Sequence, residues 1–180
     1  MKYEYFPMPK NNKTKKMATS FFFGGLILFV LGGLKMIPFR SVLQLAAVAS
    51  FVVSIMLVGR FLLRYYAYRI EDMGEGDEFF VDEITRRTRF SVCRLEMAKL
   101  IGVRKLADVP KDEKNKRRYN YCADAFTKDA YMLEFIDSKY DTAADNIRVI
   151  IQPDDKLLEI FEAAVKANAE ANSEADHEDK

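Results

Sequence analysis

The side chains that could do chemistry in this chain are few and widely spaced. The 180 residues contain one histidine, His177, and two cysteines, Cys93 and Cys122, which form no CxxC pair. A histidine triad or a histidine general base is therefore not expected. Because a structural zinc site needs about four ligands, the sequence predicts no metal and no cofactor. We expect both cysteines to be reduced, small apolar side chains in the core of a cytoplasmic domain.

Carboxylates are plentiful but do not form a pair that could share acid and base roles. Those nearest to each other, such as Asp82 with Glu83 and Asp154 with Asp155, are neighbours along the chain. Neighbours in a strand point to opposite faces. The sequence also lacks the glycine-rich phosphate loop, the dinucleotide fingerprint and the HExxH metalloprotease motif. We therefore expect a protein that is not an enzyme.

Two uncharged apolar stretches stand near the N-terminal end, Met17–Leu34 and Ser41–Gly59. A helix that rises about 1.5 Å per residue needs about 20 apolar residues to cross a bilayer. Pro38 lies in the short connection and prevents one continuous helix. The sequence therefore predicts a transmembrane helical hairpin over residues 17–63, with helices at about 17–36 and 41–63.

Basic residues around the two stretches indicate an orientation. Five lysines precede the first stretch and three arginines follow the second within ten residues or so, whereas the connection holds Lys35 and Arg40. The positive-inside rule then places both ends of a multi-pass protein of the cell membrane in the cytoplasm, with residues 1–16 as a basic cytoplasmic segment. The residues expected to anchor the hairpin at the membrane interface are Lys15, Lys16, Arg60, Arg64, Tyr65 and Tyr66.

Small residues recur at helical spacing in both stretches. Ala46, Ser50 and Ser54 are four residues apart, and Gly25 and Gly32 are seven apart. Such stripes let helix backbones approach closely. We expect the two spans to pack on each other, and a homo-oligomer that uses the same stripe is the alternative.

Charge divides the chain. Residues 1–70 carry ten basic and one acidic side chain, whereas residues 71–180 carry 18 basic and 26 acidic ones. The basic part is suited to anionic membrane lipids. The acidic part is a poor match for nucleic acid, since phosphate binding needs a basic field.

Residues 64–168 read as one small domain, rich in short strands. Aromatic and β-branched residues alternate, and Asp72–Asp77 and Thr127–Asp129 are typical of hairpin turns. After Pro153, apolar residues recur at helical spacing, which predicts a helix over 154–168 that covers the sheet. An acidic tail, 169–180, is expected to be disordered. The expected strands are 65–70, 78–85, 87–95, 101–106, 118–126, 130–136 and 146–152.

The run FFVDEITRRTRFSVCRLEMAKLIGVRKL, from Phe79 to Leu106, adds a family resemblance. It resembles bacterial membrane-anchored PH-like (pleckstrin-homology-like) domain proteins, in which a transmembrane hairpin precedes the β domain. The resemblance implies an α+β, mainly antiparallel domain, a PH-like split barrel with a C-terminal capping helix. It also implies a family without a common enzymatic activity.

Our leading hypothesis is a non-enzymatic domain, anchored in the membrane, that binds or scaffolds a protein partner there. An exposed strand edge, or the groove beside the capping helix, could take an extended peptide. The alternatives are a module that senses anionic lipids and an accessory subunit of a membrane enzyme or transporter. A solvated turn and a solvated loop are the favoured interpretation of the two basic clusters, which are also the candidate membrane or partner contacts: Arg86, Arg87 and Arg89, and Lys111, Lys114, Lys116, Arg117 and Arg118.

Overall fold

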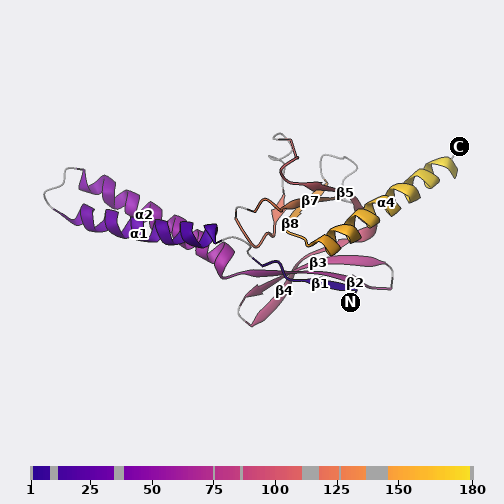
Figure 1. The fold of residues 1–180 in the computed structure, drawn as a ribbon, viewed down its shortest axis with the longest axis horizontal. Helices are drawn as coiled ribbons and strands as arrows, with labels where there is room; N and C mark the ends of the chain where they lie inside the picture. Colours follow the sequence, from indigo (N-terminus) through magenta and orange to yellow (C-terminus); the bar gives the residue numbers. More distant parts are fainter. Residues whose placement is uncertain are drawn as a thin grey trace. The chain divides into compact units, whose positions relative to one another are not determined.

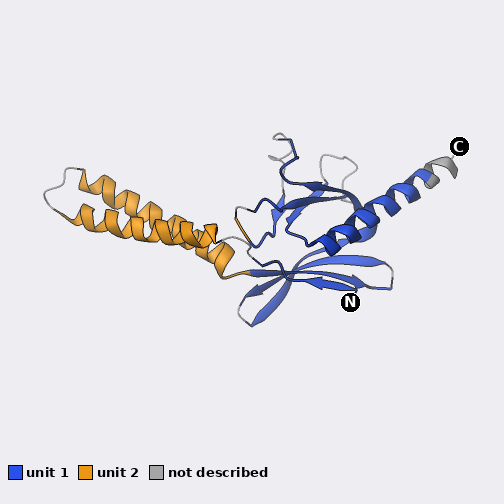
Figure 2. Ribbon diagram, viewed as in Figure 1, with its two compact units in different colours: residues 1–8, 65–123, 127–180 blue, residues 9–64, 124–126 orange. Residues whose placement is uncertain are grey.

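The chain folds as two compact units. A computed structural model describes residues 2–8, 12–34, 39–74, 76–85, 87–110, 118–125, 127–136 and 146–178 (Figure 1). The helical hairpin unit comprises Pro9–Arg64 and Asp124–Phe126, and the β domain comprises Met1–Met8, Tyr65–Ala123 and Thr127–Lys180 (Figure 2). The N-terminal residues thus belong to the same unit as the chain that follows the hairpin.

Two apolar helices form the hairpin unit, as predicted. They are α1 (Lys13–Gly33) and α2 (Arg40–Leu57), and a π-helical turn, Val58–Leu62, continues α2. With 21 and 23 residues, both are long and apolar enough to cross a membrane. Only 17% and 11% of their most apolar stretches are buried within the protein, unlike the helices of a soluble core. Helix α1 begins four residues before the expected position 17, at Lys13.

The small residues of α1 and α2 lie at the contact between the helices. A Cβ atom on Gly25 would lie 3.2 Å from both the Phe51 ring and Ser50 Cβ. The Ser54 hydroxyl is buried and donates a hydrogen bond to the Ala18 carbonyl at 2.8 Å. The expected packing within the hairpin is therefore confirmed.

Gly32 has the same role nearer the hairpin connection. A Cβ atom there would lie 2.9 Å from Gln44 Cγ. The Gln44 amide donates a hydrogen bond to the Gly32 carbonyl at 3.3 Å. The polar Gln44 side chain is thus used to join the two helices.

The first sheet of the β domain has the order β1-β2-β3-β4, and all its pairs are antiparallel. Strand β1 is a correction to the sequence analysis, which assigned residues 1–16 to a basic segment without a strand. Tyr3 pairs with Ile70, so the segment Tyr3–Tyr5 adds one strand to the edge of the sheet. Three alternating residues are too few to identify as a strand by periodicity. The bounds are β1 (Tyr3–Tyr5), β2 (Tyr65–Asp72), β3 (Asp77–Thr85) and β4 (Thr88–Glu96).

The second sheet has the order β5-β7-β8-β6, and it departs from the prediction at β6. We expected a long strand over 118–126 and a hairpin at 127–129. Instead β6 has two residues and runs parallel to β8. The chain after β6 buries Cys122 and Ala130 in a small second core, which leaves too little extended chain for a hairpin. The bounds are β5 (Leu100–Lys105), β6 (Tyr119–Asn120), β7 (Tyr131–Phe135) and β8 (Ile147–Ile151).

Helix α4 (Asp155–Glu178) covers the core between the sheets. The Asp154 carboxylate caps it, accepting a hydrogen bond from the Leu157 N–H at 3.0 Å. The helix runs past the expected end at 168, so residues 169–178 are helical rather than disordered, in keeping with their many alanines and glutamates. Residues 179–180 of the expected tail lie outside the described part.

The main core of the β domain is aromatic and aliphatic. The Phe79 ring meets the Phe161 ring edge-to-face at 5.1 Å, which joins β3 to α4. Both side chains are fully buried, and each is expected to contribute about 3–5 kcal/mol relative to alanine. The two sheets and the helix that covers their core confirm the expected α+β, mainly antiparallel architecture.

We expect Gly25→Leu to destabilise the helical hairpin by about 1–3 kcal/mol, because the new side chain must displace Phe51 and Ser50. Gly24→Leu is the matched control, since a Cβ atom on Gly24 has nothing within 4 Å. Denaturation in mixed SDS micelles, followed by energy transfer between dyes at the hairpin ends, measures the difference. Equal stability of the two variants would contradict the packing described.

Candidate functional site

Strand β4 has a sheet neighbour on one side only. In the described part of the chain it pairs with β3, and its other edge carries no strand. Two large apolar side chains on it, Phe90 and Val92, are 60% and 40% exposed. Nine residues with a free edge form a long template for pairing with another extended chain.

A β-bulge lies in the middle of β4. The register passes from Asp82 opposite Ser91 to Val81 opposite Cys93, which leaves Val92 as the extra residue. A bulge bends its strand and increases the local twist. Val92 is therefore the residue of β4 without a partner on β3, and it is 40% exposed.

A buried carboxylate holds β4 to its neighbours on the outer face of the sheet. Asp82 is 2% exposed and accepts a hydrogen bond from the Arg89 guanidinium at 2.7 Å. Arg69 lies 3.3 Å from the same carboxylate, and Arg89 also pairs with Glu4 of β1. Arg89, one of the expected contact residues, is thus engaged in ion pairs that join three strands.

Arg94 is the second arginine of β4 on this face. It forms a two-pronged ion pair with Glu78, in which one nitrogen–oxygen distance is 2.7 Å, and the guanidinium lowers the pKa of that carboxyl. The Phe80 ring lies beneath, 4.6 Å from the Arg69 guanidinium carbon and 5.7 Å from that of Arg94. Because Arg94 is 61% exposed, this pair contributes little stability.

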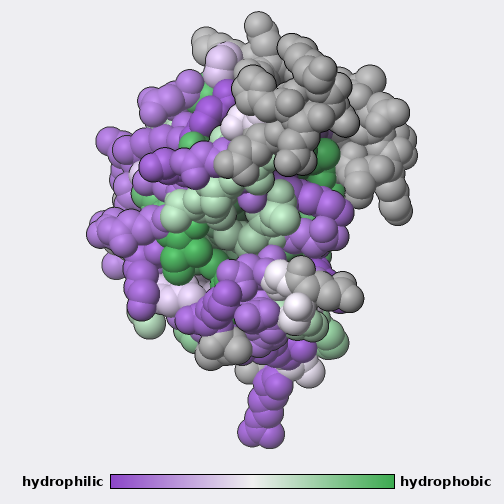
Figure 3. Space-filling view, turned by 90° about the vertical axis from the view of Figure 1, so that its right-hand side faces the viewer, coloured by the Kyte–Doolittle hydropathy of each residue, from purple (hydrophilic) through white to green (hydrophobic). Residues whose placement is uncertain are grey.

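A recess of mixed polarity lies at the end of β4. Its volume is about 270 Å³, and it combines aliphatic and charged walls. Figure 3 shows hydrophobic side chains gathered among hydrophilic ones on one face of the molecule. The lining residues are Glu78, Arg94, Leu95, Glu96, Lys99, Ile136 and Ile147.

Cys93 and three tyrosines lie at the inner side of the strands. The Tyr66 and Tyr121 rings meet at 5.6 Å, and the buried Tyr68 hydroxyl donates to the Tyr121 carbonyl at 2.8 Å. The Gln152 N–H donates to the same hydroxyl at 3.2 Å. Burial raises the pKa of Cys93 to about 11 and that of Tyr121 to about 12. This group ties β2, β4 and the chain beyond β6 together.

The expected interface anchors have different surroundings. Lys15 and Lys16 are exposed in the first turns of α1, and Arg60 is exposed in the π-helical turn that follows α2. Tyr65 is 54% exposed, but Tyr66 is 6% exposed and packs in the core, so its expected role as an anchor is wrong. Strand β2 begins at Tyr65 and turns alternate residues inward, Tyr66 first. Arg64 is exposed between the π-helical turn and β2.

The two expected basic clusters are only partly described. Arg87 is exposed at the turn between β3 and β4, and Arg118 is exposed just before β6. Arg118 shares a hollow with Lys105 and Lys128, which the sequence analysis did not single out. The sequence does not indicate that these three residues lie close together, because their proximity depends on the pairing of β6 with β8, which was not predicted. The other expected contacts lie outside the described residues: Arg86, Lys111, Lys114, Lys116 and Arg117.

Comparisons of the chain with protein-family models, with curated proteins and with solved structures give no match. Among the described residues, no three histidine, cysteine, aspartate or glutamate side chains come together as metal ligands would.

Because burial raises the pKa of Cys93 to about 11 from 9.0, its reactive thiolate is scarce at neutral pH. At pH 8 we expect iodoacetamide to modify Cys93 about a hundredfold more slowly in the folded chain than in the urea-unfolded chain. The rate in the folded chain should rise about tenfold per pH unit. Mass spectrometry of the peptide that contains Cys93 measures both rates, and equal rates at pH 8 would contradict the burial of this thiol.

Proposed function

We propose that this chain is a membrane-anchored cytoplasmic protein, without catalytic activity of its own, that binds an extended segment of a protein partner along β4. The order of its elements, two sheets followed by a covering helix, supports a pleckstrin-homology-like split barrel for the β domain. The single observation that carries the proposal is the outer edge of the nine-residue strand β4, which pairs with no other strand in the described part of the chain.

The anchor is supported by the side chains that α1 and α2 leave exposed. Phe23, Ile27 and Val30 of α1 are each more than half exposed, as are Leu45, Ile55 and others of α2. Apolar surface of this extent marks a contact with lipid or with another protein, and its extension along two helices of membrane-spanning length favours lipid. The lysines before α1 and the arginines after α2 favour a cell-membrane protein with both ends in the cytoplasm.

The binding mode follows from the chemistry of a strand edge. A peptide that adds to β4 gains backbone hydrogen bonds along the strand, and its alternate side chains reach the two faces of the sheet. Phe90 and Val92 offer it apolar contacts, and the recess lined by Leu95 and Ile147 lies at the end of the strand.

The charge of β4 favours an acidic and apolar partner segment. From Arg87 to Glu96 the chain carries three arginines, Arg87, Arg89 and Arg94, and one carboxylate, Glu96. Arg89 and Arg94 are already paired with carboxylates of β1 and β3, so the exposed Arg87 is the charge that favours an acidic residue in the partner. A second copy of β4 is a poorer fit. Antiparallel pairing centred on Ser91 and Val92 would place Arg89 opposite Arg94, and like charges directly opposite are destabilising.

A capped synthetic peptide of about ten residues that alternates valine and glutamate tests this mode. We expect it to bind the full chain in detergent micelles with a Kd on the order of 100 µM or tighter, and to protect β4 amides from hydrogen exchange. The same peptide methylated on alternate backbone nitrogens should not bind, since it cannot form the strand pairing. Fluorescence anisotropy and exchange mass spectrometry give the two readouts.

Val92→Glu should weaken binding of this acidic peptide about tenfold, because it removes an apolar contact and places a carboxylate beside the glutamates of the peptide. Met73→Glu is the matched control, since Met73 is 50% exposed in the turn between β2 and β3. Equal binding of the methylated peptide, or self-association through β4 in place of peptide binding, would overturn the proposal. So would an absence of binding at about 1 mM peptide.

A further inference from the structure

A second hollow lies on the β domain, away from the edge of β4. Its volume is about 550 Å³, within the range of small-molecule sites. Its walls come from the end of β5 and the turn after it, from the residue before β6, and from the turn before β7. The lining residues are Lys105, Leu106, Ala107, Arg118, Thr127 and Lys128.

The sheet and the second core fix the segments that form this hollow. The Leu106 N–H donates to the Ala130 carbonyl at 2.8 Å, and Lys105 is paired with Tyr131 in the register of β5 and β7. Leu106 also packs on the second core, formed by Val109, Cys122, Ala130, Met132 and Ile150. The walls are therefore parts of a folded framework.

The charge of the walls is of one sign. Among the described residues that line it, three are basic and none is acidic. In the described part of the chain, Lys105, Arg118 and Lys128 form no ion pair, in contrast to Arg89 and Arg94 of β4. Asp108 is exposed and does not line the hollow. Three cations around one concave space favour an anion within it.

We propose that this hollow binds a phosphate monoester. The Arg118 guanidinium offers a planar fork that matches two phosphate oxygens, and Lys105 and Lys128 add point charges. The Thr127 hydroxyl accepts the Asp129 N–H at 3.1 Å, which leaves its own proton to donate to a phosphate oxygen. The apolar Leu106 and Ala107 walls suit the carbon group that carries the phosphate. The inference is independent of the β4 edge.

The same phosphate chemistry can come from a lipid headgroup or from a soluble metabolite. Two probes distinguish them: glycerol 3-phosphate, and phosphatidic acid added to the detergent micelles of the full chain. Calorimetry measures the soluble probe and native mass spectrometry measures the lipid, with phosphatidylcholine as the comparison. We expect saturable binding of at least one phosphate monoester below about 1 mM, and weaker binding as salt rises.

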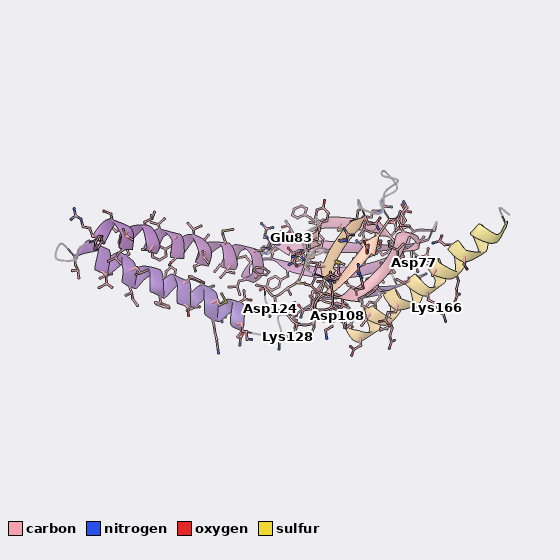
Figure 4. The ribbon with its side chains drawn as sticks, turned by 90° about the horizontal axis from the view of Figure 1, so that it is seen from above. Asp77, Glu83, Asp108, Asp124, Lys128 and Lys166 are labelled. Atoms are coloured by element: carbon pink, nitrogen blue, oxygen red, sulfur yellow. The ribbon has the colours of Figure 1, made fainter. Side chains whose placement is uncertain are left out.

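The double substitution Arg118→Gln with Lys128→Gln should reduce that binding at least about tenfold, since each lost charged hydrogen bond weakens binding by that order. Both side chains are exposed, so the fold should be retained. Lys166→Gln is the matched control, because Lys166 is 81% exposed on α4, an element separate from the turn that carries Lys128 (Figure 4).

If both probes bind and the double variant weakens both, the hollow recognises the phosphate group that they share. If only one probe binds and the double variant weakens it, that probe identifies the source of the phosphate as a lipid or a soluble compound. Binding that the double variant leaves unchanged, or that Lys166→Gln reduces equally, overturns the proposal. No binding of either probe at about 1 mM and low salt also overturns it.

Discussion

The constraint on which the rest of this structure depends is the apolar surface that α1 and α2 do not cover. Close contacts at Gly25 and Gly32 bury one stripe of each helix, and the phenylalanines, leucines and valines on the other sides stay exposed. Both helices are long and apolar enough to cross a membrane, so lipid is the cover that we propose for this surface. The proposed membrane anchor follows from this, and so does the use of the flanking basic residues at the headgroups.

The β domain, in contrast to the helical hairpin, buries its apolar side chains in an enclosed core. Its two sheets and α4 enclose an aromatic core centred on Phe79 and Phe161. Among the described residues no strand pairs with the outer edge of β4, while Asp82 and its arginines hold the strand in place. A firmly held strand with an open edge is suited to binding another chain, since it need not reorganise to pair. The basic hollow beside β5 is a separate feature, and we propose that it binds a small anion.

The sequence predicted the elements that rest on strong local periodicity. The hairpin helices, the β2–β3 and β3–β4 hairpins, and the start of α4 after Pro153 were all readable from apolar spacing and turn residues. The edge strand at Tyr3 and the parallel pair of Tyr119 with Val149 were not, because both depend on partners far along the chain. The same limit applies to the sites. Arg87 and Arg89 were found as a cluster, but the ion pairs of Arg89 and the grouping of Arg118 with Lys128 come from tertiary structure.

The most direct test of the account is the accessibility of the β domain in sealed membrane vesicles of known orientation. Protease should remove the β domain from inverted vesicles, in which the cytoplasmic face is outward, and should leave it intact in right-side-out vesicles until detergent is added. A protected hairpin fragment should remain in the membrane. Digestion from the outer face, or recovery of the intact chain in the aqueous fraction without detergent, would contradict the central claim.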